Sequence, residues 1–334
     1  MDIPLHPSHK VIDSSKIEAY TTCPRKYFFR YILNWAPEGK AHDLFFGECF
    51  HTGMEIMLQS LIQHGQYTDE SVEAAFKAFE EKYRSEFPPD TDDIYSPKTP
   101  NYAKIAYSEY ANLNRVESFI VKNIEVAGRV LVGQDKDGED RLLTFRLDAV
   151  IEDEQGIRVM DHKTSKMNIE TRTWADQWRL SFQLGTYIHA LYSYLGYDNV
   201  VGAVVNGFQF RETPKTDRGW KDRTTVHNYC RVRVQKNKNH MQSWLEDINR
   251  ILDDMDYDMV LLDSCTPDSP VMSAFQRRPK YACTSYNRTC PFIDFCESWA
   301  NPLQNVEIDG DIVRPEIGFQ IEPWDPTKLS IGGE

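Results

Sequence analysis

Two acidic residues and a lysine in the middle of this sequence have the types and the spacing needed for hydrolytic chemistry. Asp148 and the triplet Asp161-His162-Lys163 lie in the run FRLDAVIEDEQGIRVMDHKTSK. Side chains alternate between the two faces of a strand, so Asp161 and Lys163 should project to one side and His162 to the other. If the expected strands at residues 141–152 and 157–164 pair as a hairpin, Asp148 can lie on the same side as Asp161 and Lys163.

This grouping suits the hydrolysis of a phosphodiester. Carboxylates bind hard divalent cations such as Mg²⁺ or Mn²⁺, and the cation lowers the pKa of a bound water. The lysine would orient that water or neutralise charge growing on the phosphoryl oxygens. A lone D-x-K is usually a surface ion pair. Here the apolar neighbours and Asp148 favour a site, because inward-facing charge in a core strand is costly unless it is used.

Two further segments could complete such a site, Gly47-Glu48-Cys49-Phe50-His51 upstream and Gln183-Leu184-Gly185-Thr186-Tyr187 downstream. A single histidine on a helix is more often structural than a metal ligand, and imidazole suits Mn²⁺ better than Mg²⁺. Gln183 and Tyr187 share one helical face, as they would on any amphipathic helix. Each segment is weak alone, and their joint occurrence favours a site.

In combination, these segments resemble the RecB-like PD-(D/E)XK nucleases. The runs Arg146–Val150 and Val159–Thr164 resemble the active-site hairpin of that superfamily, and the other two segments match its G-x-x-x-H and Q-x-x-x-Y motifs. The resemblance implies these roles: metal binding by His51, Asp148, Asp161 and the backbone carbonyl of His162; assistance to the attacking water by Lys163; and substrate positioning by Gln183 and Tyr187. Glu125 could match another acidic position of the family.

A second group consists of cysteines. Seven cysteines, an odd number in a chain without a signal peptide, argue against a disulfide framework. Cys283, Cys290 and Cys296 cluster near the C-terminus and need a fourth ligand, for which Cys23 is the candidate. Thiolate tetrads suit zinc and iron–sulfur clusters alike. The remaining cysteines, Cys49, Cys230 and Cys265, are expected to be small buried residues.

The segment around Cys23, Tyr20–Tyr27, resembles the C-P-x-x-(Y/F) signature of AddB-type and CRISPR-associated RecB-like exonucleases. That resemblance implies a [4Fe–4S] cluster on Cys23, Cys283, Cys290 and Cys296, with a structural Zn²⁺ as the alternative. The C-x₆-C-x₅-C spacing is looser than the C-x₂-C often seen in that family. Such a centre would clamp distant segments and stabilise the fold rather than take part in the reaction.

Basic residues outnumber acidic ones between Arg211 and Lys238, with aromatic residues among them. Basic groups contact phosphates and aromatic rings stack on unpaired bases, although a solvated loop has the same composition. The predicted DNA contacts are Arg25, Lys26, Arg218, Trp220, Lys221 and Arg223. The net charge of −13 argues against a protein that coats nucleic acid non-specifically, but not against a basic groove.

The elements expected to position these residues are helices at 14–31, 45–64, 69–87 and 102–122, then strands at 124–134, 141–152 and 157–164, then a helix at 174–195, strands at 200–211 and 226–235, and a helix at 239–256. This order indicates an α/β fold, a PD-(D/E)XK restriction-endonuclease-like core with a central mixed sheet flanked by helices. We expect one integrated domain with four regions: an N-terminal helical region (1–120), the nuclease core (121–265), the cysteine segment (266–300) and an acidic tail (301–334).

The sequence therefore predicts a metal-dependent DNA nuclease, an exonuclease on single strands or ends, in recombination, repair or replication. The alternatives are a non-catalytic iron–sulfur scaffold that binds DNA and a structure-specific endonuclease. No phosphate-binding loop of the G-x-x-x-x-G-K-(S/T) type occurs, so unwinding would need a helicase or recombination partner. No apolar run of about 18 residues and no signal peptide is present, which predicts a cytoplasmic protein without a membrane partner.

Overall fold

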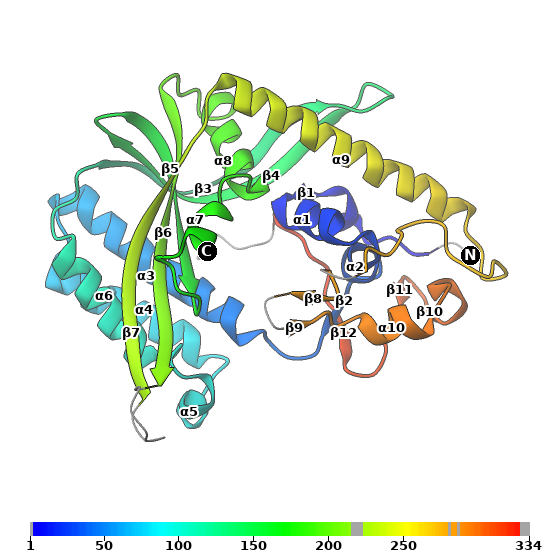
Figure 1. Cartoon of the computed structure of the whole chain (residues 1–334), viewed down its shortest axis with the longest axis horizontal. Coiled ribbons are helices and arrows are strands. Elements are labelled where there is room, and N and C mark those ends of the chain that lie inside the picture. Colours follow the sequence, from blue (N-terminus) through cyan, green and yellow to red (C-terminus); the bar gives the residue numbers. More distant parts are fainter. Residues whose placement is uncertain (1–2, 215–222, 280–281, 286–287, 328–334) are drawn as a thin grey trace. The chain divides into compact units, whose positions relative to one another are not determined.

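The computed structural model describes residues 3–214, 223–279, 282–285 and 288–327, and the chain divides into two compact units (Figure 1). The first unit consists of Met1–Gly39, Arg129–Phe145 and Asn239–Glu334, and the second of Lys40–Gly128 and Arg146–Lys238. Two long strands, β3 (Ile120–Gln134) and β4 (Asp140–Asp153), pair with each other and contribute residues to both units.

The second unit is built on a mixed sheet. Strand β4 pairs antiparallel with β5 (Gly156–Ser165), which pairs parallel with β6 (Val200–Pro214), and β6 pairs antiparallel with β7 (Arg223–Gln235). Two parallel neighbouring strands must be joined by a connection that crosses from one end of the sheet to the other. Helices α7 (Arg172–Asp176) and α8 (Phe182–Ser193) supply it between β5 and β6.

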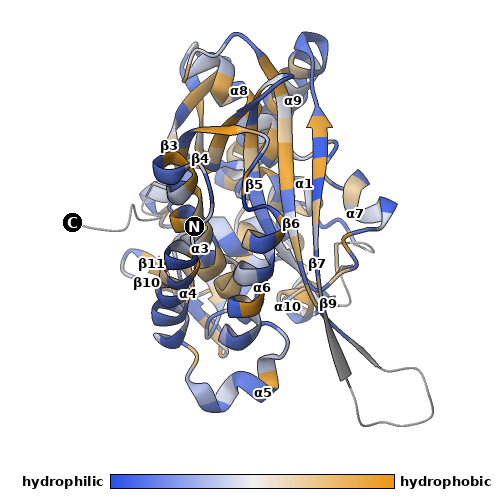
Figure 2. Cartoon of the chain, turned by 90° about the vertical axis from the view of Figure 1, so that its left-hand side faces the viewer, coloured by the Kyte–Doolittle hydropathy of each residue, from blue (hydrophilic) through white to orange (hydrophobic). Residues whose placement is uncertain are grey.

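The hydropathy of a strand in this sheet depends on whether the strand is internal or at the edge. In Figure 2, β6 is mainly hydrophobic, whereas β7 alternates hydrophobic and hydrophilic residues. β6 has a neighbour on each side and β7 is the last strand in the order, so β6 is covered more completely. The β5 residues from Gly156 to His162 are likewise all buried, which means that any charge among them lies inside the protein.

Helices of the second unit cover the sheet with an aromatic core. The helices α3 (His42–His64), α4 (Asp69–Arg84) and α6 (Pro100–Leu113) lie side by side in Figures 1 and 2. Their buried residues form one cluster with Phe208 and Phe210 of β6. A central mixed sheet flanked by helices is therefore present, and the predicted fold class is confirmed. Between α4 and α6 lie a 3₁₀ turn (Pro89–Thr91) and the short helix α5 (Asp92–Tyr95).

The first unit combines helices and short strands with the adjoining parts of β3 and β4. Its helices are α1 (Ser14–Thr22), α2 (Pro24–Tyr27) continued by a π-helix (Phe28–Ile32), α9 (Lys238–Ser264) and α10 (Ile293–Ser298), with 3₁₀ turns at Pro7–Lys10 and Pro302–Gln304. Strand β1 (Ile12–Asp13) pairs parallel with the first half of β4. The other pairs are β2 (Trp35–Pro37) with β12 (Phe319–Ile321), β8 (Thr284–Ser285) with β9 (Arg288–Thr289), and β10 (Ile308–Asp309) with β11 (Ile312–Val313).

Some expected elements differ from those observed. The helix expected at 174–195 is two helices, because Ser181 caps a new one by accepting a hydrogen bond from the Leu184 N–H. Helix α6 ends at Leu113, and part of the expected 102–122 helix belongs to β3. Helix α1 is capped by Asp13, whose side chain accepts a hydrogen bond from the Lys16 N–H. Across the described residues, no helix combines the length and the apolar character needed to span a bilayer.

Candidate active site

Asp148 lies where strands β4 and β5 stop pairing. Their hydrogen-bonded register runs from Asp153–Gly156 to Ala149–Met160. Just beyond it, the main-chain N–H of His162 donates to Asp148 Oδ2 at 2.7 Å. The carboxylate, which is 9% exposed, is thereby fixed to the β5 backbone.

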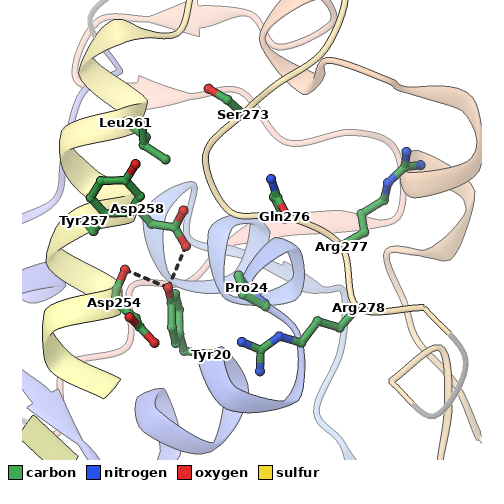
Figure 3. Close-up of a pocket in the computed structure, with 10 residues that line it drawn as sticks. All are labelled: Tyr20, Pro24, Asp254, Tyr257, Asp258, Leu261, Ser273, Gln276, Arg277 and Arg278. Atoms are coloured by element: carbon green, nitrogen blue, oxygen red, sulfur yellow. Dashed lines mark hydrogen bonds between the residues drawn. The ribbon is translucent and has the colours of Figure 1, made fainter. Parts of the chain in front are cut away.

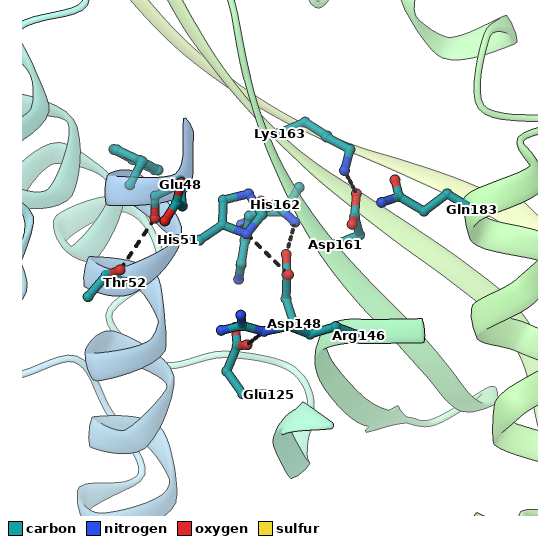
Figure 4. Close-up of polar contacts among 12 residues, drawn as sticks. Glu48, His51, Thr52, Glu125, Arg146, Asp148, Asp161, His162, Lys163 and Gln183 are labelled. Carbon is teal, nitrogen blue, oxygen red and sulfur yellow. Dashed lines mark hydrogen bonds and ion pairs between the residues drawn. The ribbon is translucent and has the colours of Figure 1, made fainter. Parts of the chain in front are cut away.

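Helix α3 brings a histidine to the same carboxylate. His51 Nδ1 lies 3.1 Å from Asp148 Oδ1 (Figure 4). On β5, Lys163 Nζ lies 2.7 Å from Asp161 Oδ2, so these two side chains share a face of the strand, as the sequence predicts. The His162 ring lies 6.0 Å from the His51 ring, edge to face. Two carboxylates, an imidazole and an ammonium group thus gather in one small region of the second unit.

The two carboxyl groups differ in their electrostatic environment. Burial alone would raise the pKa of Asp148, but the charge of His51 and its hydrogen bond lower it below the ordinary value. Burial raises the pKa of Asp161, and the negative charge of Asp148 adds to this effect although Lys163 opposes it. Burial also lowers the pKa of His162 to about 3, which keeps that ring neutral. Buried acids that disfavour each other's ionisation form a site that a divalent cation would stabilise.

Residues of α8 approach this group from another side. Gln183 Nε2 donates to Tyr187 Oη at 2.9 Å, and Tyr187 is only 6% exposed. Figure 4 shows the Gln183 amide on the side of Asp161. Gln183 is therefore placed to contact a molecule at the carboxylates, and the nearly buried Tyr187 holds the Gln183 amide.

Glu125 also belongs to this region. Its Oε2 accepts a hydrogen bond from Arg146 Nε at 2.6 Å, and its backbone adopts a positive φ of 49°, which is uncommon for a residue with a side chain. Burial raises the pKa of Glu125, and the negative charge of Asp148 raises it further.

Sequence reasoning missed two residues of this region, Trp178 beside Lys163 and Lys98 beside Thr164. Lys163 Nζ lies 5.9 Å from the ring centroid of Trp178, in cation–π range, and Trp178 stands in the break between α7 and α8. Lys98 Nζ lies 3.4 Å from Thr164 Oγ1 and is 3% exposed. Ser181, a residue type that favours the N-cap of a helix, could have predicted that α7 and α8 are separate helices. No motif or residue spacing in the sequence indicated Lys98.

The four predicted cluster ligands all lie in the first unit. Cys23 is buried, and Cys283, Cys290 and Cys296 are partly buried. The Arg278 main-chain N–H points at Cys23 Sγ, at 3.4 Å, and the Cys290 N–H donates to the Cys283 carbonyl at 2.8 Å. Within the described ranges, no three His, Cys, Asp or Glu side chains are arranged to hold a metal ion.

The other three cysteines were predicted to be buried. Cys49 and Cys265 are buried, as expected, and Cys230 is only partly so. Cys230 lies on β7, the last strand in the sheet order, where covering is less complete.

The predicted DNA contacts have mixed outcomes. Arg218, Trp220 and Lys221 lie outside the described residues, and Arg223 is described only as the first residue of β7. Lys26 is partly buried. Arg25 is only 2% exposed, and its Nε donates to the Phe275 carbonyl at 3.0 Å, so it has no surface to offer a phosphate.

The first unit also has a cavity of about 310 Å³ beside Cys23 (Figure 3). Its lining residues are Tyr20, Pro24, Asp254, Tyr257, Asp258, Leu261, Ser273, Gln276, Arg277 and Arg278. Tyr20 Oη donates to Asp258 Oδ2 at 2.6 Å, and Asp258 Oδ1 accepts from the Phe275 N–H at 2.8 Å. These bonds tie the helix before Cys23 to α9 and to the segment that leads to the other cysteines.

Comparison of the sequence with models of known protein families finds a match. The family model described as the PD-(D/E)XK nuclease superfamily matches residues 14–297. No curated protein matches the chain. Among solved structures the chain is similar to one titled "Crystal structure of SSO0001", at 13% identity over 59% of this chain and 82% of that chain, with a TM-score of 0.24.

Proposed function

Because the chain belongs to the PD-(D/E)XK nuclease superfamily, we propose that it is a metal-dependent DNA nuclease that degrades single strands or strand ends. One observation carries the proposal: His51, Asp148, Asp161 and Lys163 form a connected set of contacts at the end of the β4–β5 ladder. Burying two acids beside an apolar core, with a partly buried lysine against one of them, would be a poor choice for stability alone.

The types of donor present suit a divalent cation, although no three of the described acidic, histidine or cysteine side chains are arranged around one point. Two buried carboxylates supply hard oxygen ligands, and His51 supplies a nitrogen that Mn²⁺ accepts. In this proposal His51, Asp148, Asp161 and the His162 carbonyl hold Mg²⁺ or Mn²⁺. The bound cation would lower the pKa of a water and polarise the phosphoryl oxygens.

The protein's own groups then have separate tasks. Asp148 is held by the His162 N–H and His51, so its orientation is set before substrate binds. Lys163 lies between Asp161 and the Trp178 ring, which confines its ammonium group to the site, where it can orient the nucleophile and neutralise phosphate charge. Gln183, held by Tyr187, would position the scissile strand.

The test is cleavage of DNA labelled at the 5′ or 3′ end, single- or double-stranded, with Mg²⁺ or Mn²⁺. We expect wild type to cut and Asp161→Ala and Lys163→Ala to lose activity while remaining folded. The matched controls Asp137→Ala and Lys136→Ala change exposed residues of the β3–β4 turn and should cut normally.

Three outcomes would contradict the proposal. Normal cleavage by Asp161→Ala refutes the site. A folded wild type that binds DNA but cuts nothing makes the chain a non-catalytic DNA-binding scaffold. Cleavage of circular single-stranded DNA, which has no ends, makes it an endonuclease instead of an exonuclease.

We further propose that Cys23, Cys283, Cys290 and Cys296 ligate a [4Fe–4S] cluster in the first unit. Four thiols are a suitable donor set, and N–H groups aimed at sulfur, such as that of Arg278 at Cys23, stabilise thiolates. Burial raises the pKa of Cys290 and, to about 11, that of Cys296, so without a metal these thiols stay neutral. Their ionisation would follow metal binding.

Arg25 supports the same proposal through its charge. Its Nη1 is buried and has no hydrogen-bond partner among the described residues, and burial lowers the pKa of Arg25, an effect that negative charge on Cys296 and Cys23 would oppose. A buried guanidinium needs an anionic partner. Metal-bound thiolates would supply one, whereas neutral thiols do not.

Anaerobic purification followed by iron, sulfide and zinc analysis tests the cluster. Equal amounts of iron and sulfide with visible absorbance, lost in Cys23→Ser, are expected. Zinc alone would replace the cluster with a structural zinc site, and an absence of both metals would refute it. We also propose that the protein acts on DNA together with a helicase or recombination protein. The proposed location is the cytoplasm.

A further inference from the structure

A line of buried polar side chains runs through the second unit, away from the candidate metal ligands. It starts at His162 on β5, whose Nδ1 lies 3.1 Å from Asn206 Nδ2 on β6. Asn206 Nδ2 also donates to Tyr110 Oη on α6 at 2.9 Å. Arg231 on β7 donates to Tyr110 Oη at 2.6 Å and to Glu117 Oε2 at 2.8 Å. His162, Asn206 and Tyr110 are each 1% exposed.

With the Asn206 amide oriented as in the structure, the chemistry of these groups gives the direction of each hydrogen bond. Arg231 can only donate, and the single hydroxyl proton of Tyr110 faces Glu117 Oε1 at 3.5 Å. The Tyr110 oxygen therefore accepts from Asn206. An amide nitrogen cannot accept, so His162 Nδ1 must accept from it. His162 is thus a neutral ring that carries its proton on Nε2.

The packing of strand β6 does not require a polar side chain at position 206. His162 and Asn206 stand opposite each other in the parallel β5–β6 register. The residues around Asn206 on β6 are apolar, and an apolar side chain would fill its place without needing partners. Asn206 Oδ1 and His162 Nε2 have no hydrogen-bond partner among the described residues, so this polar pair is not the arrangement that packing alone would favour.

We propose that Asn206 is a positioning residue for the metal site, acting through His162. By holding the His162 ring from the side, Asn206 fixes the β5 main chain at the one residue whose N–H orients Asp148. Tyr110 and the Arg231–Glu117 pair anchor Asn206 in turn. The inference rests on the proposed function, because it assigns Asn206 to the support of a metal ligand.

The sharpest perturbation is Asn206→Asp, which keeps the shape and removes both donors. An ionised aspartate cannot donate to Tyr110 or to His162 Nδ1, so the line is broken at its centre. Loss of a group that supports a metal ligand weakens metal binding about 10- to 100-fold. We expect the Mn²⁺ dissociation constant to rise by that factor and kcat to fall, with little change in the KM for DNA.

A matched control is available in the first unit. Asn301 is 0% exposed, and its Nδ2 also donates two hydrogen bonds, to the carbonyls of Thr266 at 2.9 Å and Ser269 at 2.8 Å. Asn301→Asp makes the same change at the same depth. It should lower stability and leave Mn²⁺ affinity unchanged, which separates positioning from a general loss of stability.

The experiment measures Mn²⁺ binding by calorimetry for wild type, Asn206→Asp, Asn301→Asp and Tyr110→Phe, together with the ¹⁵N spectrum of His162 in metal-free wild type. We expect weaker binding only in Asn206→Asp and Tyr110→Phe, and the Nε2–H tautomer in wild type. Unchanged Mn²⁺ affinity in folded Asn206→Asp overturns the inference, as does an Nδ1–H tautomer. If Asn206→Asp does not fold, the Mn²⁺ affinity of Tyr110→Phe and the tautomer of His162 in wild type test the inference instead.

Failure of the proposed function would look different. A wild type that binds no Mn²⁺ and cuts no DNA refutes the nuclease and, with it, the role of Asn206. The tautomer of His162 depends on neither measurement, so an Nε2–H signal in that protein would locate the error in the function and not in the hydrogen-bond line.

Discussion

Gly53→Ala should destabilise the protein, because Gly53 marks the closest approach of three helices in the second unit. A Cβ at this position of α3 would lie 2.2 Å from Tyr107 Oη on α6 and 2.9 Å from the Ala75 carbonyl oxygen on α4. Real Cβ atoms essentially never come closer than 3.0 Å to such atoms. Either Tyr107 must move or the helices must separate.

Tyr107 has little freedom to move. It is 0% exposed, it stacks on Phe50 with ring centroids 4.5 Å apart, and its hydroxyl donates to the Phe50 carbonyl at 2.9 Å. Overpacking costs about 1–3 kcal/mol. Losing the buried hydrogen bond costs about 1–3 kcal/mol more. Alanine recovers about 1 kcal/mol of helix propensity. The net expected loss in the free energy of unfolding is therefore about 1–5 kcal/mol.

Urea denaturation measures this loss, and Gly47→Ala on the same helix is the control. A Cβ at Gly47 would meet only Thr164 Oγ1 at 3.5 Å, an ordinary contact, so that variant should be neutral or slightly more stable. His51 lies between these two glycines, so Gly53→Ala should also shift it from Asp148 and reduce cleavage. A Gly53→Ala protein as stable as Gly47→Ala would refute the packing argument.

Three further outcomes are expected. Arg231→Met leaves Glu117 buried without its cation and should cost about 3–5 kcal/mol in urea denaturation, part of which Glu117→Gln in the same chain restores. Lys16 is 0% exposed and burial lowers its pKa to about 8 from 10.5, so its charge opposes folding below pH 8 and no longer does so above pH 10.5. The stability of wild type relative to Lys16→Met should therefore rise across that interval, and equal pH profiles would refute this. Trp178→Ala removes the ring beside Lys163, a contact worth about 0.5–2 kcal/mol, and should lower kcat/KM by about 2- to 30-fold. Unchanged kinetics would exclude a role for the ring.

The candidate active-site hairpin could be predicted from the sequence because the signals for it are local. Asp161 and Lys163 are two residues apart in a strand, and the period of a strand alone places them on one face. Asp148 follows from hairpin pairing. His51 could be named only through its motif, since no spacing rule brings α3 to within 3.1 Å of Asp148.

The errors came from properties that tertiary contacts decide. Arg25 was expected to touch DNA because it is basic, yet the Phe275 carbonyl holds it inside the first unit. Trp178 was hidden inside one long expected helix, although the cap at Ser181 ends that pattern. Asn206 stands in an apolar strand and was not singled out, because its meaning depends on the ring opposite it on the next strand.

The division of the chain has a consequence for the order of its synthesis. A ribosome that has released residues up to Lys238 has delivered every segment of the second unit, so the candidate active site can fold early. The first unit needs its N-terminal segment, the tip of the β3–β4 hairpin and the C-terminal segment from Asn239 onward. Cys23 therefore emerges first and waits longest, since the other three cysteines are among the last residues made. Any nascent chain interrupted before Cys283 would carry a complete set of candidate nuclease residues without its proposed metal centre.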